Sequence, residues 1–206
     1  QRQQKEKELA VVEEEKTLRA EKERKRQWFE KFRWFISSEG FLCVGGRDST
    51  SNEILIKKHT EPNDLVFHCE LAGSPFFVVK AAEKAAANEE AKLNLIGKAT
   101  IEEAAIATAS FSKAWKSGLS AVEVYYVKPG QVTKQARAGE YIAKGAFMIY
   151  GKKNYVAAKL ELAIGITEDG KIMCGPIAAV AKNCGKYARI TQGNTKPSDA
   201  GKYLLK

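Results

Sequence analysis

The stretch WFEKFRWFISSEGFLCVGGRD, residues 28–48, decides how we expect this chain to fold. Six of its first fifteen residues are aromatic, a density typical of a hydrophobic core rather than of a solvated surface. The small and polar residues 37–40 predict a turn, and residues 41–45 predict a short buried strand. This stretch therefore opens a globular domain, and we expect the helix that leads into it to end near Phe35.

The 27 residues before this stretch are of a different kind. They hold nine basic and seven acidic side chains and no glycine or proline, which favours a helix. A heptad pattern runs through this segment, with one of its core positions occupied by Val11, Leu18, Lys25 and Phe32. The end of a coiled-coil arm and a single solvated helix both remain open, because Glu14 and Glu21 also occupy core positions of that pattern. The chain starts at Gln1 inside this charged run, so we expect it to be a piece of a longer protein.

Beyond the aromatic stretch, helical and strand patterns alternate. The pairs Thr50/Glu53 and Thr100/Glu103 have capping-box spacing, which predicts that a helix begins at each. The first element would be short, with a strand as the alternative, and the second would run over 101–116 and close at a following glycine.

Strand patterns occupy the apolar stretches that remain. They cover residues 64–73, 75–81, 121–128, 148–156, 160–167, 171–173 and 186–191. A short helix is expected at 176–182, and Ser198 would cap a last one. The prediction is an α+β fold, a mostly antiparallel sheet with packed helices, preceded by the helical arm.

Several classes of site are excluded by composition. The four cysteines, Cys43, Cys69, Cys174 and Cys184, form no CxxC pair, and the chain has two histidines. We therefore expect buried thiols in a reduced, cytoplasmic compartment rather than a zinc site or a disulfide framework. No glycine-rich nucleotide motif and no 18-residue apolar run occur, so we expect no cofactor, no metal and no membrane span.

The formal net charge of +9 is unevenly distributed. Residues 28–120 hold 11 basic and 12 acidic side chains, whereas residues 121–206 hold 14 and 6. Within 124–160 a single anion stands against seven cations, Lys128, Lys134, Arg137, Lys144, Lys152, Lys153 and Lys159. Because glycines and tyrosines interleave with them, this segment indicates a nucleic-acid surface, with a plain solvated basic face as the alternative.

Two further clusters could carry chemistry. Asp64 and His68 lie four residues apart on an expected strand, which would suit an acid–base pair, although a structural histidine hydrogen-bonded within the sheet is favoured. In the GGRD sequence at 45–48, Asp48 is expected to cap the next helix while Arg47 grips a phosphate or carboxylate.

Four motifs in order resemble one known family: WFEKFRWFISSEGFLCVGGRDSTSNE, DLVFHCELAGS, EEAAIATASFSKAW and VEVYYVKPGQVTKQARAGEYIAKGAFMIYGKKN. They resemble the NFACT RNA-binding domain of NEMF, RqcH and fibronectin-binding protein A-like ribosome quality-control proteins. The extension after residue 155 resembles the archaeal or eukaryotic style, and we expect an archaeal member. Cys69 and Thr133 depart from the usual pattern.

The resemblance implies three parts: residues 1–35 as the end of a coiled-coil arm, 36–155 as the domain core, and 156–206 as an α/β extension packed on it. It implies a non-enzymatic module that contacts tRNA or rRNA on large ribosomal subunits with a stalled nascent chain, and that supports C-terminal tailing. A partner for the coiled coil is expected as well.

The motifs and the charge together select eight residues for RNA contact. These are Arg47, His68, Lys128, Lys134, Arg137, Lys144, Lys152 and Lys153. The alternative is an RNA-modifying or hydrolytic enzyme that uses Asp64, His68 and Arg47. An extracellular adhesin has little support, because no disulfide pattern accompanies it.

Overall fold

The computed structural model describes residues 27–71, 73–81, 96–135 and 141–195. The chain divides into two units, Gln1–Lys31 and Phe32–Lys206. In the first unit the described part is a short 3₁₀ helix, η1 (Trp28–Lys31). The predicted coiled-coil arm, the loop over 82–95 and the predicted cap at Ser198 lie outside the described residues.

The expected helix does not continue to Phe35. Strand β1 (Arg33–Ile36) occupies this position and pairs with β2 (Leu42–Gly45) in an antiparallel hairpin. Phe35 is fully buried and Gly40 takes a positive φ of 83° in the turn. Adjacent aromatic side chains of a strand point to opposite faces, so a strand places Trp34 and Phe35 in two packed layers, which one helix face could not do. The strand also crosses the domain boundary that we expected at residue 35.

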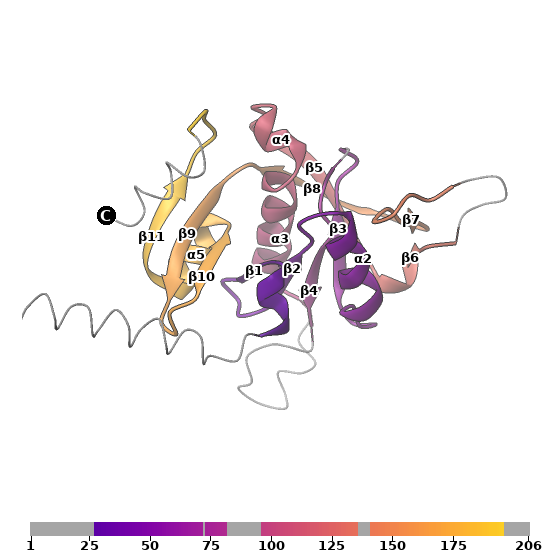
Figure 1. Cartoon of the computed structure of the whole chain (residues 1–206), viewed down its shortest axis with the longest axis horizontal. Helices are drawn as coiled ribbons and strands as arrows, with labels where there is room; N and C mark the ends of the chain where they lie inside the picture. Colours follow the sequence, from indigo (N-terminus) through magenta and orange to yellow (C-terminus); the bar gives the residue numbers. More distant parts are fainter. Residues whose placement is uncertain (1–26, 72, 82–95, 136–140, 196–206) are drawn as a thin grey trace, which may run out of the picture. The chain divides into compact units, whose positions relative to one another are not determined.

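The main sheet has six strands, in the order β1-β2-β4-β3-β5-β8, and every pairing is antiparallel. Its remaining strands are β3 (Leu65–His68), β4 (Phe77–Lys80), β5 (Ala121–Val127) and β8 (Asn154–Lys159). Helix α3 (Lys98–Ser110) packs across β3, β4, β5 and β8 (Figure 1). Half of its buried positions are alanine, which allows the helix to approach the sheet closely. The predicted α+β class with an antiparallel sheet is confirmed.

Both helices predicted from capping-box spacing form, but neither predicted pair, Thr50/Glu53 or Thr100/Glu103, makes the box; at the start of α2 (Ser49–Lys58), Asp48 and Ser51 make one instead. Helix α2 is capped by Asp48, whose carboxylate accepts from the Ser51 amide, so the predicted Asp48 cap is confirmed. Helix α3 begins at Lys98, two residues before Thr100, with Gly97 as its N-cap. The Thr100 hydroxyl and amide instead bond Glu39, because that carboxylate reaches the first turn from the β1–β2 hairpin. The helix then breaks at residues 111–112 before α4 (Lys113–Lys116).

The C-terminal part adds a second sheet, in the order β10-β9-β11. It consists of β9 (Leu162–Thr167), β10 (Ile172–Gly175) and β11 (Cys184–Ile190), with helix α5 (Ile177–Asn183) between the last two. Helix α5 packs on β9 and β11, and β10 lies beside β1. A small hairpin, β6 (Val132–Thr133) and β7 (Met148–Ile149), lies at the opposite side of the main sheet in Figure 1.

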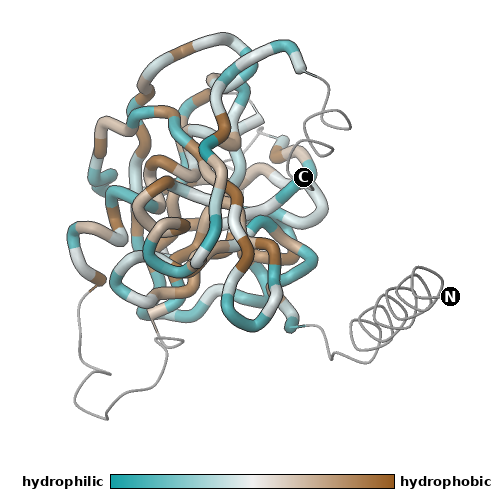
Figure 2. Tube along the Cα trace, turned by 90° about the vertical axis from the view of Figure 1, so that its left-hand side faces the viewer, coloured by the Kyte–Doolittle hydropathy of each residue, from teal (hydrophilic) through white to brown (hydrophobic). Residues whose placement is uncertain are grey.

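Apolar segments gather where these layers meet (Figure 2). The core includes Phe35, Phe67 and Phe77, each fully buried, and three of the four thiols are buried. Within the described ranges no helix is both long and apolar enough to cross a bilayer.

Candidate nucleic-acid interface

A polar cavity of about 340 Å³ opens at one end of the main sheet. Strand β1 begins there, β2 and β3 end there, and β4 begins there. Among the described residues, the charged and titratable groups that line it are Arg33, Arg47, Asp48, His68 and Lys144. Three permanent cations therefore converge with one carboxylate in a concave site.

Two guanidinium groups lie beside the C-terminal end of β2, where they line the cavity. Arg33 donates to the Gly46 carbonyl and lies over the Phe111 ring, 5.0 Å from its centroid. Burial and the neighbouring charge of Arg47 lower the pKa of Arg33, though a guanidinium remains charged at any physiological pH. The Arg47 guanidinium donates to the Phe32 carbonyl at 3.0 Å. These two carbonyl bonds fix the position of both guanidinium groups at the cavity.

The cavity's carboxylate is committed to the start of α2. Asp48 Oδ1 accepts from the Ser51 amide at 2.8 Å and from its hydroxyl at 2.9 Å. These bonds lower the pKa of Asp48, the backbone bond most strongly. The Ser51 hydroxyl also accepts from the amides of Arg47 and Asp48, which closes the loop onto the helix.

The tandem glycines of this loop permit a close approach. A Cβ on Gly46 would lie 1.9 Å from Asn52 Oδ1, and one on Gly45 would lie 2.3 Å from the Phe77 ring. Asn52 Oδ1 accepts from the Phe76 amide at 3.2 Å, which ties α2 to β4. We predicted a tight turn from the two glycines. The structure shows that glycine is needed at both positions because the Phe77 and Asn52 side chains leave no room for a Cβ.

Lys144 reaches the cavity on a segment clamped against α2. Glu53 Oε2 accepts from the Gly145 amide at 3.0 Å and pairs with Lys134 at 3.2 Å, while Oε1 pairs with Lys57 at 2.6 Å. These contacts, that with Lys57 foremost, lower the pKa of Glu53 to about 2. Gly145 has a φ of 79°, and a Cβ there would lie 2.4 Å from Ser49 Cα.

His68 forms part of the cavity wall. Its Nδ1 lies 3.1 Å from the Pro75 carbonyl, and because a carbonyl can only accept, this nitrogen carries the proton. The ring stacks on Phe76 with centroids 4.1 Å apart. Burial lowers the pKa of His68, which favours the neutral ring near pH 7.

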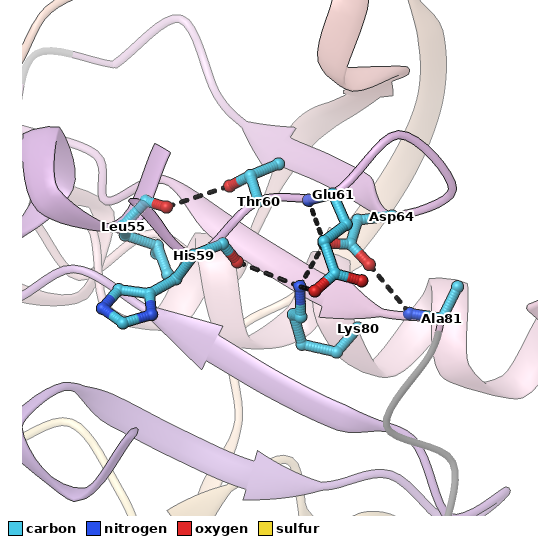
Figure 3. Close-up of polar contacts among 7 residues, drawn as sticks. All are labelled: Leu55, His59, Thr60, Glu61, Asp64, Lys80 and Ala81. Atoms are coloured by element: carbon cyan, nitrogen blue, oxygen red, sulfur yellow. Dashed lines mark hydrogen bonds and ion pairs between the residues drawn. The ribbon is translucent and has the colours of Figure 1, made fainter. Parts of the chain in front are cut away.

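Asp64 does not join His68. Its carboxylate is fully buried, pairs with Lys80 Nζ at 2.6 Å and accepts from the amides of Glu61 and Ala81 (Figure 3). It lies four positions before His68 along extended chain, roughly 13 Å away at 3.3 Å per residue. The acid–base pair of the enzyme alternative is therefore absent, because Asp64 is a structural ion-pair partner at the other end of β3.

Seven of the eight residues predicted for RNA contact lie in the described part of the chain and fall into three groups. Arg47, His68 and Lys144 line the cavity together. Lys134 and Lys153 are bound to Glu53 and Glu70, each with a quarter of its side chain exposed. Lys128 and Lys152 are exposed, and Arg137 lies outside the described residues.

Sequence reasoning missed Arg33. We placed it on a helix, where nothing distinguished it from other basic residues of the arm. Its role follows from β1, which sets its side chain beside Gly46 and Arg47. Within the described parts of the chain, no cluster of three or more His, Cys, Asp or Glu side chains is arranged to hold a metal ion.

Comparison with known proteins gives several matches. The family model described as the NFACT protein RNA binding domain matches residues 31–151. An archaeal Rqc2 homolog, aRqcH of Methanocaldococcus jannaschii, is 38% identical over 88% of this chain and 26% of its own length. The ribosome quality control complex subunit NEMF homolog of Drosophila melanogaster is 39% identical over 71% of this chain and 14% of its own.

The human ribosome quality control complex subunit NEMF is 39% identical over 66% of this chain and 12% of its own length. The chain thus spans between about an eighth and a quarter of these relatives. The family model covers more than half of the chain, from β1 through the segment that carries Lys144. On this evidence the chain belongs to the NFACT RNA-binding domain family.

Proposed function

We propose that this chain is the RNA-binding module of a cytoplasmic, ribosome-associated quality-control factor, and that it acts without catalysis of its own. The observation that carries the proposal is the convergence of Arg33, Arg47 and Lys144 in one cavity, where Asp48 is already committed to a helix cap. Guanidinium groups bind phosphate oxygens in bidentate fashion, and a concave site raises their local potential.

The surrounding lysines support the same function by a different route. Lys134 holds the segment of Lys144 in place through Glu53, the Ala143 carbonyl at 3.0 Å and the Phe147 ring at 4.7 Å. We therefore treat Lys134 as a positioning residue. Lys128 and Lys152, which are exposed, add long-range attraction for a polyanion.

The partner class follows from the relatives. Proteins named as ribosome quality control subunits share this domain, so we propose tRNA or rRNA of a large ribosomal subunit with a stalled nascent chain as the ligand. Support for C-terminal tailing of that chain would belong to the longer protein of which this module is one part.

Salt titration of RNA binding tests the proposal. With three phosphate contacts, log K should fall with log salt with a slope of about 2, at roughly 0.7 per contact on a single strand. Arg47→Glu and Lys144→Glu should each weaken binding to tRNA and to isolated large subunits and lower the slope by about 0.7 or more. Lys182→Glu, an exposed charge on α5, is the matched control with the same change in net charge.

Two outcomes would refute the proposal. One is equal binding by the Arg47, Lys144 and Lys182 variants, which would leave only nonspecific attraction by the net charge. The other is turnover of RNA by the purified chain, abolished by His68→Ala, which would restore an enzymatic role.

A further inference from the structure

Five rings form a continuous row that starts in the cavity and crosses the sheet. Phe147 meets Phe76 with centroids 5.4 Å apart, and Phe76 stacks on His68 at 4.1 Å. His68 then meets Tyr125 at 6.1 Å, and Tyr125 meets Tyr155 at 6.0 Å. The last three are register partners on β3, β5 and β8, so their side chains share one face of the sheet.

Exposure differs sharply between the rings of this row and is highest at the last of them, Tyr155. Phe76 is 2% exposed and Tyr125 is 3% exposed, whereas Tyr155 is 53% exposed. Tyr155 stands on β8, the last strand of the sheet order, and supports its ring against Tyr125. A half-exposed tyrosine held edge-on by a buried neighbour keeps a fixed orientation and offers a free apolar surface.

Cations accompany the row over its length. Lys153 lies over the Tyr125 ring, 4.3 Å from the centroid, and also pairs with Glu70. Lys152 and Lys159 are exposed on the same segment of chain as Tyr155. At the other end stand the three cations of the cavity. Interfaces between proteins are depleted of charged residues at their centres, so aromatic rings set among lysines fit a polyanion better.

We propose that this row is a track for an unpaired RNA strand, with a phosphate in the Arg33/Arg47/Lys144 cavity and a base stacked on Tyr155. The inference rests on the proposed function and specifies its ligand. Bases within a duplex are already stacked and paired, so only an unpaired nucleotide can present its face to a tyrosine. The two ring spacings put Tyr155 at most roughly 12 Å from His68, the length of three to four stacked nucleotides at about 3.4 Å each.

The experiment compares a labelled 12-nucleotide single-stranded RNA with the same sequence in a duplex, by fluorescence anisotropy with the whole chain. Tyr155→Ala should weaken binding of the single strand about 5- to 150-fold, the effect of losing one stacked base, and leave duplex binding unchanged. Tyr155→Phe should bind as the wild type does, because the ring is retained. Tyr187→Ala, which removes a 43% exposed tyrosine of β11, is the matched control.

The outcomes separate this inference from the proposed function. Equal binding by the Tyr155→Ala and Tyr187→Ala variants, with Arg47→Glu still impaired, would overturn the track and leave the cavity as the RNA site. Loss of large-subunit binding in Tyr155→Ala with unchanged single-strand binding would assign Tyr155 to a contact other than an unpaired base and also overturn it. Circular dichroism shows whether Tyr155→Ala is folded, and if it is not, Tyr155→Ser replaces it as the variant without a ring. Weakening of single-strand binding by Tyr155→Phe as large as that by the variant without a ring would overturn the track as well.

Discussion

The buried ion pair between Lys80 and Asp64 offers a sharp test of whether Asp64 is structural. Lys80 Nζ lies 2.6 Å from Asp64 Oδ2, with side-chain exposures of 2% and 0%, and also donates to the His59 carbonyl at 3.0 Å. Lys80→Met keeps the aliphatic stem and removes the ammonium group. Asp64→Asn keeps the shape and removes the opposite charge.

The expected cost follows from what each change leaves behind. Removing one partner of a buried pair costs about 3–5 kcal/mol, because the other charge stays buried without compensation. Asp64 keeps two amide donors, from Glu61 at 2.8 Å and Ala81 at 3.0 Å, so we expect about 3 kcal/mol for Lys80→Met, the lower end of that range. In a unit of this size that corresponds to a fall in Tm of roughly 6–12 °C.

A double-mutant cycle measured by urea unfolding provides the assay. The variant with both changes should lose about 2 kcal/mol less than the two single losses added together, because neither charge is then left unpaired. RNA affinity of the folded fraction should stay within twofold of the wild type, since neither residue lines the cavity. Additive losses, or single losses below about 1 kcal/mol, would refute the buried-pair reasoning, and a loss of RNA affinity would return Asp64 to the functional site.

Three more predictions concern the site itself. The pKa of Glu53 is lowered from 4.5 to about 2, so its carboxylate stabilises the fold above pH 4.5 and loses that contribution as the pH falls toward 2. The difference in Tm between the wild type and Glu53→Gln should therefore be largest at pH 6 and vanish near pH 2. Burial lowers the pKa of His68 from 6.5, so the folded state favours the neutral ring and loses stability as the pH drops below 6.5. In His68→Gln, the fall in Tm below pH 6.5 should be smaller than in the wild type, because no imidazole is left to protonate. Gly145→Ala should cost about 1–3 kcal/mol in urea unfolding because of its positive φ and the Ser49 backbone, whereas Gly130→Ala, which meets nothing within 4 Å, should not. Equal stability of the two alanine variants would contradict the close approach.

Much of the fold could be read from local patterns. Hydrophobic alternation predicted strands at 64–73 and 121–128, and Asp48 was identified as a cap from the GGRD sequence. Our predictions were wrong at positions where contacts with distant parts of the chain outweigh the local sequence preference. Thr100 and Glu103 have capping-box spacing, but Glu39 from the distant hairpin bonds the first turn of α3, and no local pattern contains that contact.

For the candidate site as well, some residues could be identified from the sequence and others only from the structure. Charge density in residues 124–160 pointed to Lys144, and the family motifs pointed to Arg47 and His68. Arg33 could not be identified, because its significance depends on β1 bringing it beside Gly46. The lysines could not be ranked either, since pairing with Glu53 or Glu70 depends on residues 81 or more positions away in the chain.

By itself, the sequence determined the fold class, the location of the excess charge and the family, because composition, periodicity and ordered motifs are properties of the chain read in one dimension. Only the tertiary structure decided which charges act together. It separated Asp64 from His68, joined Arg33 to Arg47 and Lys144, and set rings from five segments in one row. The physical reason is that burial, ion pairing and ring contact depend on distances between residues far apart in the chain, and those distances exist only once the sheet has formed.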